Sequence, residues 1–389
     1  MMYTLLLLTA PAPVQILDVH PTLGPYFEIS GAIAAASDGD VIRVADGLYL
    51  PFIIDGLGIS IVPLDADPDI TVQGPVRIGN IGTGESVSVS GLSISGVQGS
   101  FDTPLSVANS DGSVRIQDCD VLPTAVTPGV VLESAMDVVV INTVVTFGGS
   151  GDGGAGISAA RSILSLFNVT ANGGHTSWTG GSGSAAIALF DSTVFASACM
   201  LVGGDGGPGY SDGSFTGFQC IIEPGNGGAG MLLLGGSSVT ALGCDVTSGF
   251  PGVDWNFFCT GGFRPPSFTA DGSSTATEVS GLGPELHCPS RQSLGSPFPF
   301  SITAESTDFV MLAASPRSAR VDAPGATGSF LLDTTPGQIR RINLGVGPIQ
   351  SSIDIPAIPS LIGATWSFQT GHVRAGSLVL GPVRTVVFL

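Results

Sequence analysis

A short repeat of alternating apolar residues joined by a polar corner constrains the fold of this chain more than any other feature. In the stretch 114–149, Val114 and Ile116 alternate with polar residues, Asp118 provides a one-residue corner, and Cys119 begins a second alternating run. A second copy of the pattern follows in the same stretch. Two such strands cannot bury their apolar faces alone, so the pattern requires further copies stacked above and below.

The corner recurs along about half of the sequence, and the residue after each corner is predicted to point into one shared interior. These inner positions are Leu92, Cys119, Thr143, Val169, Cys199, Cys220 and Cys244, and the corners before them are Gly91, Asp118, Asn142, Asn168, Ala198, Gln219 and Gly243. The inner positions lie roughly 21 to 30 residues apart, which is the coil length of a parallel β-helix. We therefore predict an all-β chain built around such a helix.

Glycine-rich breaks begin about four or five residues after most of the inner positions. They widen into four long loops, at residues 148–156, 173–184, 203–213 and 225–230. In a stacked solenoid, insertions at one offset emerge along one edge. The sequence thus predicts a ridge of glycine-rich loops along one side of the helix, called the loop ridge below.

Composition narrows the class of protein. The chain has 57 Gly, 27 Pro and 7% aromatic residues, yet 43% of it is apolar, which favours many short strands separated by turns over disorder. All 12 basic residues are Arg, which excludes Schiff-base lysines, Walker-type phosphate loops and Ser-Lys dyads. A formal charge of −19 disfavours nucleic acid and anionic membrane surfaces as partners.

The N-terminal residues 1–13 resemble a degenerate secretion signal. Four leucines precede an Ala-Pro-Ala sequence, although no basic residue comes before them. No later apolar run is long enough to span a bilayer. The even count of six Cys fits an oxidising compartment, so we predict a bacterial-type protein that is secreted or lies on the cell surface.

The entrance to the repeat carries a resemblance to a known family. An Ala-rich segment predicted as a helix leads through Gly-Asp and Gly-Leu-Tyr turns into the first coil, over residues 30–49 and 52–61. This stretch resembles the opening of right-handed parallel β-helix proteins of the pectate lyase and pectin esterase superfamily. The resemblance implies a right-handed β-helix with an N-terminal capping helix, and it implies no particular activity.

We predict three regions after the signal-like segment. Residues 14–255 form the right-handed parallel β-helix with its N-terminal cap, and the Pro-rich residues 256–300 form an irregular connection. Short strands at regular spacing over 301–389 indicate a small antiparallel β-sandwich. Its stretch 355–363 with Phe368 and Gln369 resembles a terminal module of large secreted bacterial proteins, which implies a role in sorting or attachment.

Several apolar residues are predicted to face outward from the helix. They are Val139, Ile141, Val144, Phe167, Phe195, Met200 and Ile221. An exposed apolar area of this size is usually covered. We expect the C-terminal module, the loops or a partner chain to cover it, and self-association through this face is one of these alternatives.

The cysteines allow two interpretations. Cys199, Cys220 and Cys244 fall on successive coils, where an unbridged column of small buried thiols is favoured over a disulfide. Cys259 and Cys288 both lie in the irregular connection, so we predict a disulfide between them. No pair has zinc-like spacing and the four His are scattered, so no structural metal site is expected.

The loop ridge gathers residues suited to carbohydrate. They are Asp152, His175, Trp178, Asp205, Tyr210 and Asp212. Aromatic rings stack on sugar faces and carboxylates accept hydroxyl hydrogens, although these rings could instead pin their loops to the helix. Gly-Asp-Gly-Gly at 151–154 and 204–207 makes calcium a second possible ligand of Asp152 and Asp205, with turn formation as the alternative.

An enzymatic alternative uses paired carboxylates, either Asp118 with Asp120 or Asp152 with Asp205. Members of the resembling superfamily that act on uronates generally use a basic residue and clustered carboxylates on the sheet face. Here Arg115 beside Asp118 and Asp120 is the comparable group, and we expect no counterpart on the following coils.

A separate Gly-x-Ser-x-Gly string at 209–213 lacks the strand and helix that a nucleophile elbow needs around its Ser.

Taken together, these patterns predict a structural or adhesive β-helix protein that binds a polysaccharide or cell-surface glycan on the loop ridge. The alternative is a polysaccharide lyase or glycoside hydrolase acting through paired carboxylates. We expect no cofactor other than a calcium ion at Asp152 and Asp205. Nucleic acid binding and membrane insertion are not expected.

Overall fold

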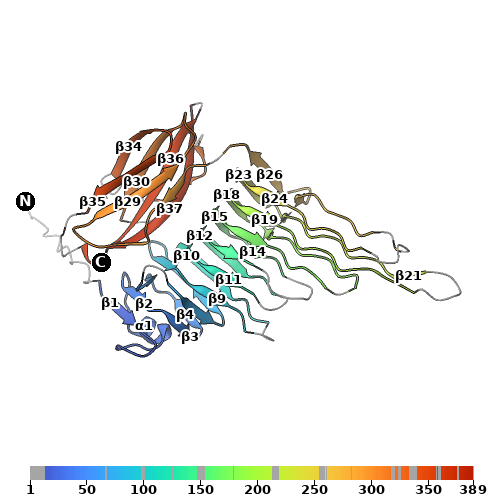
Figure 1. Ribbon diagram of the computed structural model, residues 1–389, viewed down its shortest axis with the longest axis horizontal. Helices are drawn as coiled ribbons and strands as arrows, with labels where there is room; N and C mark the ends of the chain where they lie inside the picture. Colours follow the sequence, from blue (N-terminus) through green and yellow to red (C-terminus); the bar gives the residue numbers. More distant parts are fainter. Residues whose placement is uncertain are drawn as a thin grey trace, which may run out of the picture.

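The chain forms a parallel β-helix with a flat lateral extension and a C-terminal β-sandwich (Figure 1). The structure, a computed structural model, describes residues 14–65, 68–97, 101–123, 127–146, 154–177, 179–212, 219–253, 259, 261–281, 283–316, 320–322, 326–332, 340–355, 357, 361–374 and 376–388. The predicted signal segment, residues 1–13, lies outside these ranges. No helix in the described part of the chain is long and apolar enough to cross a membrane.

The β-helix has three faces. Face 1 consists of β1 (Ile16–Val19), β2 (Val41–Val44), β5 (Ser60–Pro63), β8 (Ser86–Ser90), the second halves of β10 (Leu105–Gln117) and β12 (Val130–Ile141), β15 (Ile163–Phe167), β18 (Thr193–Ser197), β23 (Ser238–Leu242) and β26 (Thr275–Val279). Face 2 consists of β4 (Phe52–Asp55), β7 (Val76–Gly79), the first halves of β10 and β12, β14 (Ile157–Ala160), β17 (Ile187–Phe190), β22 (Met231–Leu234) and β25 (Phe268–Ala270). Face 3 consists of β3 (Gly47–Tyr49), β6 (Ile70–Gln73), β9 (Ser93–Ser95), β11 (Asp120–Leu122), β13 (Val144–Val145), β16 (Thr170–Asn172), β19 (Met200–Val202) and β24 (Asp245–Thr247).

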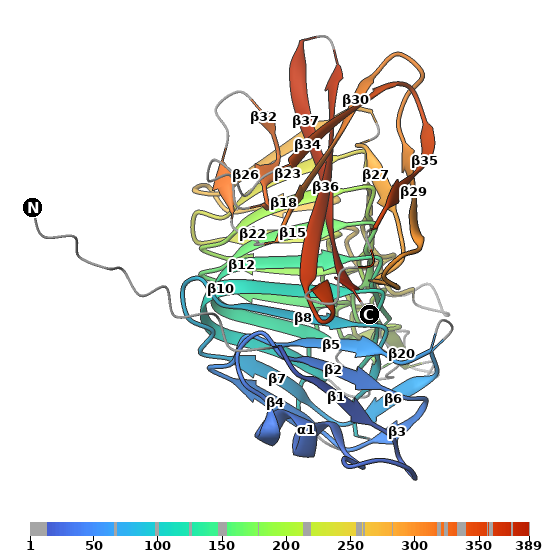
Figure 2. The ribbon, with the colours of Figure 1, turned by 90° about the vertical axis from the view of Figure 1, so that its left-hand side faces the viewer.

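The described strands of these faces pair in parallel from rung to rung. Crossover connections between parallel strands are almost always right-handed. The predicted fold class, a right-handed parallel β-helix followed by a β-sandwich, is therefore confirmed. Helix α1 (Ile29–Ala35) covers the N-terminal end as expected, with Ile29 and Ala32 buried in the cluster that fills the helix interior (Figure 2).

The predicted corners turn the chain from face 1 to face 3. They have positive φ between 47° and 69°, a conformation that Gly, Asn and Asp adopt most readily. These corners are Gly91, Asp118, Asn142, Asn168, Ala198 and Gly243. Side chains stack between them, because Asn142 Nδ2 donates to Asp118 Oδ1 at 3.1 Å and Asn168 Nδ2 donates to Asn142 Oδ1 at 3.0 Å.

The predicted interior column is correct at most positions. Leu92, Cys119, Thr143, Val169 and Cys199 are at most 2% exposed.

Cys220 was wrongly included in this column, with Gln219 as its corner. Cys244 lies directly next to Cys199, whose backbone N–H donates to Cys244 Sγ at 3.5 Å. Cys220 lies instead in β21 (Gln219–Ile222), which pairs with β20 (Tyr210–Asp212) in a hairpin outside the helix. The long insertion in this rung has about the length of one coil, so the sequence interpretation counted it as a separate coil.

The helix also extends beyond the predicted boundary at residue 255. Strands β25 and β26 pair in parallel with β22 and β23 and add one more rung inside the stretch predicted as an irregular connection.

The sandwich begins at β27 rather than at residue 301. One of its sheets contains β27 (Glu285–His287), β29 (Pro297–Thr303) and β35 (Ile349–Asp354). The other contains β28 (Arg291–Gln292), β37 (Ser377–Phe388), β36 (Thr365–Arg374), β30 (Phe309–Ser315), β34 (Arg340–Val346) and β32 (Ala326–Thr327), with β31 (Val321–Asp322) and β33 (Ser329–Phe330) forming a separate small ladder. Phe298 and Phe300 from the first sheet pack with Phe368 and Phe388 from the second in one apolar cluster.

The sandwich covers most of the outward apolar residues. Val139, Ile141, Phe167 and Phe195 on face 1 are buried in one cluster with apolar residues of the C-terminal module. This confirms the expectation for these four. In the described part of the chain neither the sandwich nor the loops cover Val144, Met200 and Ile221, which are 37%, 45% and 56% exposed, because they lie on face 3 and on the β21 hairpin. Coverage of these three residues by a partner chain stays a prediction.

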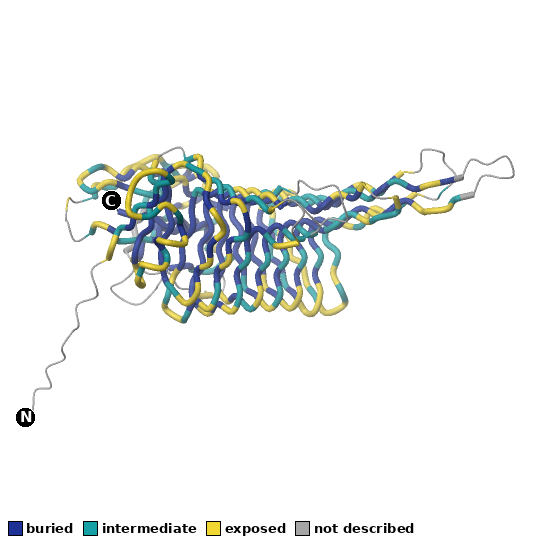
Figure 3. The backbone as a smooth tube through the Cα atoms, turned by 90° about the horizontal axis from the view of Figure 1, so that it is seen from below, coloured by how far each residue is buried: buried dark blue, intermediate teal, exposed yellow. Residues whose placement is uncertain are grey.

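The glycine-rich loops form a flat two-layered extension, seen as a thin projection in Figure 3. We call it the glycine plate. It comprises outgoing segments 173–177, 203–209 and 248–253 and returning segments 180–186, 223–230 and 261–266.

The outgoing segments of the plate bond to one another at every third residue. The N–H groups of Gly203, Gly206 and Gly209 donate to the carbonyls of Thr247, Phe250 and Val253, at 2.9, 2.8 and 3.2 Å. A period of three residues is that of the polyproline II conformation rather than of a β-strand.

The two layers of the plate also bond to each other. Gly204 donates to Ser184 at 2.8 Å and Gly228 donates to Gly204 at 2.7 Å. A Cβ atom on Gly204 would lie 2.0 Å from the carbonyl oxygen of Gly174. Contacts this close leave room for glycine alone, which explains the composition of the loops.

Candidate functional site

A cleft of about 970 Å³ lies between face 1 of the β-helix and the sandwich. Its carboxylates are Asp38, Glu85, Asp111, Asp137 and Asp322, and its hydroxyl groups come from Ser60, Thr83, Ser86, Ser88, Ser113, Thr365, Ser367 and Thr385. Arg320 is the basic residue of this lining. Most side chains that line the cleft are therefore polar, and most of its charged side chains are acidic.

The floor of the cleft is a buried charge network centred on Asp137. The fully buried Arg115 donates from Nη2 to Asp137 Oδ2 at 2.9 Å, and the Ser113 hydroxyl donates to the same oxygen. From the C-terminal module, Arg320 donates to Asp137 Oδ1 at 3.4 Å and to Ser165 Oγ at 2.6 Å. The network joins the two parts of the protein directly beneath the cleft.

The network keeps Asp137 ionised. Burial alone would raise the pKa of its carboxyl group, but the charge and hydrogen bond of Arg115, followed by Arg320 and Ser113, outweigh burial and hold the pKa below its ordinary value.

The predicted catalytic group does not assemble. Arg115 pairs with Asp137, whereas the carboxylate of Asp118 accepts hydrogen bonds from Arg384 Nη1 at 2.8 and 3.0 Å. Asp120 is exposed on β11 of face 3, and neither Asp118 nor Asp120 lines the cleft. The corner at Asp118 separates the two aspartates onto different parts of the rung.

The sequence contained the signal for the correct partner. Val114 and Val138 are equivalent positions of successive coils, and the residues before them, Ser113 and Asp137, are register partners. Asp137 is thus a carboxylate on the next coil that the sequence interpretation did not pair with Arg115.

Two of the loop ridge residues make hydrogen bonds within the plate. His175 Nδ1 accepts the backbone N–H of Asp205 at 3.0 Å, and Asp205 Oδ1 accepts the N–H of Phe250 at 2.7 Å. These contacts link successive loops. Tyr210 is 52% exposed on β20.

The described part of the structure does not include the side chains of the other predicted ridge residues. Asp152 and Trp178 lie outside the described residues, and so does the side chain of Asp212. The carbohydrate and calcium assignments on the ridge stay predictions.

The Ser of the Gly-x-Ser-x-Gly string, Ser211, is buried in the β20–β21 hairpin. Strand β20 pairs antiparallel with β21, and residues 213–218 between them lie outside the described residues, so the expectation about this string stays a prediction.

The predicted disulfide between Cys259 and Cys288 is wrong. Cys259 is bonded to Cys220, with Cα atoms 4.8 Å apart, because the last long loop passes beside β21. Cys288 is a free thiol in the sandwich, and burial raises its pKa to about 12.

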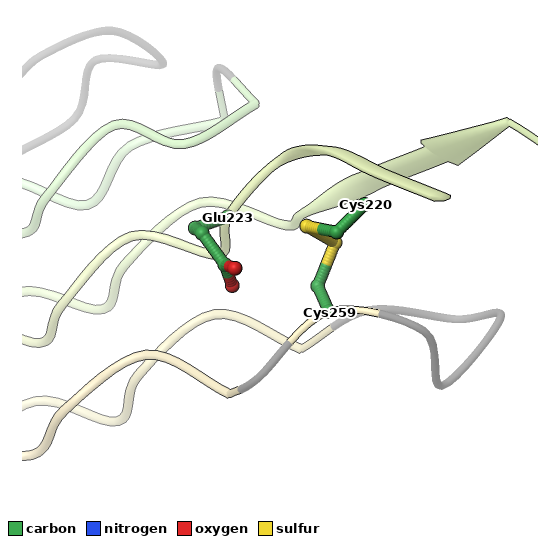
Figure 4. A group of neighbouring side chains, drawn as sticks. All are labelled: Cys220, Glu223 and Cys259. Atoms are coloured by element: carbon green, nitrogen blue, oxygen red, sulfur yellow. A yellow bond between two sulfur atoms is a disulfide. The ribbon is translucent and has the colours of Figure 1, made fainter. Parts of the chain in front are cut away.

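Glu223 lies beside the Cys220–Cys259 disulfide (Figure 4). One potential ligand atom from each of Cys220, Glu223 and Cys259 lies within 4.8 Å of the other two. Among the described residues this is the one group of three such side chains. The sequence could not reveal this group, because the lengths of the inserted loops determine which of their residues become neighbours.

The chain matches no protein-family model, and no curated protein matches its sequence. Among solved structures, it is similar to pectin methylesterase from carrot, with 13% identity and a TM-score of 0.36 over 70% of this chain and 89% of that one. It is also similar to the enzymatically active domain of bacteriophage CBA120 tailspike protein 2, with 10% identity and a TM-score of 0.27 over 95% and 67% of the two chains. A pectin methylesterase from Aspergillus niger gives 12% identity and a TM-score of 0.22 over 70% and 87%. Values this low carry no inference about activity.

Proposed function

We propose that the protein is a secreted or cell-surface adhesive protein that binds glycans, and that the cleft between face 1 and the sandwich is its binding site. The observation that carries the proposal is the cleft itself, about 970 Å³ of space lined by hydroxyl and carboxylate groups. Ligand pockets commonly occupy roughly 300 to 1,000 Å³. The size suits several sugar rings rather than one.

The chemistry of the lining favours a polyhydroxylated ligand. Eight hydroxyl side chains and five carboxylates line the cleft, and its larger apolar side chains are Met136, Ile163 and Pro316. Hydroxyl groups both donate and accept hydrogen bonds, and carboxylates accept them. Sugars present the complementary pattern around their rings.

The charge of the cleft favours neutral over anionic glycans. Arg320 is already paired with Asp137, so the remaining carboxylates, among them Asp38 and Asp111, are left without a basic residue of the lining to offset them. Uronate, sulfate or phosphate groups would be repelled by this surface.

The site is held by interactions between the helix and the sandwich. Gln117 and Thr385 exchange two hydrogen bonds of 3.1 and 3.3 Å, next to the Asp118–Arg384 pair. A preformed site loses little conformational freedom on binding. The Cys220–Cys259 disulfide supports the extracellular location.

A glycan array with the purified full chain tests the proposal. Ser86→Trp places a large ring at an exposed position of the cleft lining and should abolish binding. Met200→Trp makes a similar change at an exposed position on face 3 and should leave binding intact. Loss of binding in Tyr210→Ala but not in Ser86→Trp would move the site to the loop ridge and contradict the proposal.

The carboxylates around one cleft support a second candidate, a glycoside hydrolase. Such enzymes need two carboxyl groups roughly 5 to 10 Å apart, one ionised and one able to donate a proton. Asp137 is ionised, and Asp111 or Glu85 would be the acid. Release of reducing ends from a neutral polysaccharide, lost in Asp111→Asn, would favour hydrolysis over binding alone.

A further inference from the structure

The outer end of the glycine plate carries a group of side chains that the glycan site does not use. Cys220 on β21, Glu223 just after it and Cys259 on the next loop bring two sulfurs and a carboxylate to one point, with these atoms within 4.8 Å of one another (Figure 4). The two sulfurs form a disulfide in this structure. The group therefore ties together the ends of two successive loops.

The surroundings of the sulfurs are electron-rich. Cys259 Sγ lies 3.4 Å from the carbonyl oxygen of Ile222 and 3.7 Å from that of Tyr210, in addition to the carboxylate of Glu223. Two thiolates beside these oxygens would repel them and one another. A bound cation would offset that repulsion, whereas two protonated thiols would donate to the carbonyls.

We propose that this group cross-links the two loops in two alternative forms. It is a disulfide under oxidising conditions and a site for a soft divalent cation such as Zn²⁺ under reducing conditions. Two thiolates and one carboxylate match the ligands that Zn²⁺ accepts, and a water molecule completes four-coordination. In either state the loop carrying β21 and the loop carrying Cys259 stay joined.

The exchange requires a two-electron reductant, which the chain does not supply. A phosphine such as tris(2-carboxyethyl)phosphine breaks the S–S bond, takes oxygen from water to become the phosphine oxide, and leaves both cysteines as thiols. The ion then displaces the two thiol protons, so that binding releases protons and weakens as pH falls.

Zinc binding to the reduced full-length protein tests the proposal. The chain is reduced with the phosphine, exchanged into reductant-free buffer under nitrogen and titrated with Zn²⁺ alone, with bound metal measured after gel filtration. We expect one ion per chain in the reduced protein and none in the oxidised protein. With Co²⁺ as a second probe, a thiolate-to-metal charge-transfer band should appear in the near ultraviolet.

Matched variants assign the ion to this group. Cys259→Ser should lose the ion, and Glu223→Gln should bind it about tenfold more weakly while still forming the disulfide. Cys244→Ala removes the other neighbouring thiol pair, Cys199 with Cys244, and should retain the ion. Reduced protein that binds no zinc, or that retains it in Cys259→Ser, would overturn the proposal.

The outcome is independent of the glycan site. Because the group lies on the plate and the cleft lies against the sandwich, Cys259→Ser should bind glycans as the unchanged protein does.

Discussion

The rungs of the β-helix and the glycine plate are parts of the same coils, but they are stabilised in opposite ways. In the rungs, apolar side chains such as Leu166 and Val169 fill a shared interior and are fully buried. In the plate, Gly204 has backbone partners on both sides and no room for a side chain. One region gains its stability from burying side chains, and the other from excluding them. The comparison predicts that removing side-chain atoms lowers the stability of the rungs, whereas adding them lowers the stability of the plate.

The largest expected effect is the loss of a side chain from a rung. Leu166→Ala should lower the free energy of unfolding by about 2–5 kcal/mol, because the cavity lies between Val140 and Ala196 on neighbouring rungs and cannot collapse. Denaturant unfolding measures this. Leu234→Ala, at a position 39% exposed on face 2, is the matched control and should change it by less than about 1 kcal/mol.

The next effect is the addition of a methyl group to the plate. Gly204→Ala should cost about 1–3 kcal/mol of local stability, because the new Cβ meets the carbonyl of Gly174 and these two neighbouring outgoing segments must move apart. Amide hydrogen exchange should lose protection at Gly204 and Gly228 while the rung strands keep theirs. Gly261→Ala, where a Cβ has no atom within 4 Å, should leave protection unchanged. Equal exchange in the two variants would contradict the backbone-packed description of the plate.

The same contrast explains how much could be predicted from the sequence. Rung positions were predictable because a side chain such as Val169 or Cys119 must alternate to be buried, and alternation is visible in the letters. The plate was predicted only as loops, since its hydrogen bonds join backbone groups that every residue has. The Cys220–Cys259 bond was missed for that reason, because its geometry depends on how far each loop extends.

The cleft was missed for a different reason. It lies between two modules, and its Asp137–Arg320 contact joins residues far apart in the chain. The repeat could place Asp137 beside Ser113, but nothing in the repeat locates Arg320. Only the docking of the sandwich on face 1 creates the space between them.

A smaller effect is a difference in acid sensitivity between the rungs around Asp137 and the glycine plate. Asp137 has a folded pKa below its ordinary value, so its contribution is complete above about pH 4 and is lost as pH falls through the folded pKa. The bonds that the amides of Gly204 and Gly228 make within the plate end on backbone carbonyls, which do not titrate. Acid titration should therefore weaken protection of β12 and the segment around Arg320 before that of Gly204 and Gly228.

Asp137→Asn is the variant that checks this assignment, because its amide cannot titrate. It should remove the acid-dependent step from the β12 segment while leaving the plate unchanged. An identical acid profile in Asp137→Asn would place the titrating group elsewhere.

The smallest expected effect is a gain of stability, whereas the earlier variants lose stability. It concerns the boundary between a rung strand and its corner. Ala198 occupies a corner with φ of 54°, where its Cβ is strained and where other corners carry Gly, Asn or Asp. Ala198→Gly should therefore raise the free energy of unfolding by about 0.5–1 kcal/mol. Ala196→Gly, two residues earlier inside β18, removes a buried methyl group and should lower it by a similar amount. The two variants make the same chemical change in one rung, so opposite shifts of the denaturation midpoint isolate backbone conformation from side-chain burial, and shifts of the same sign would contradict that separation.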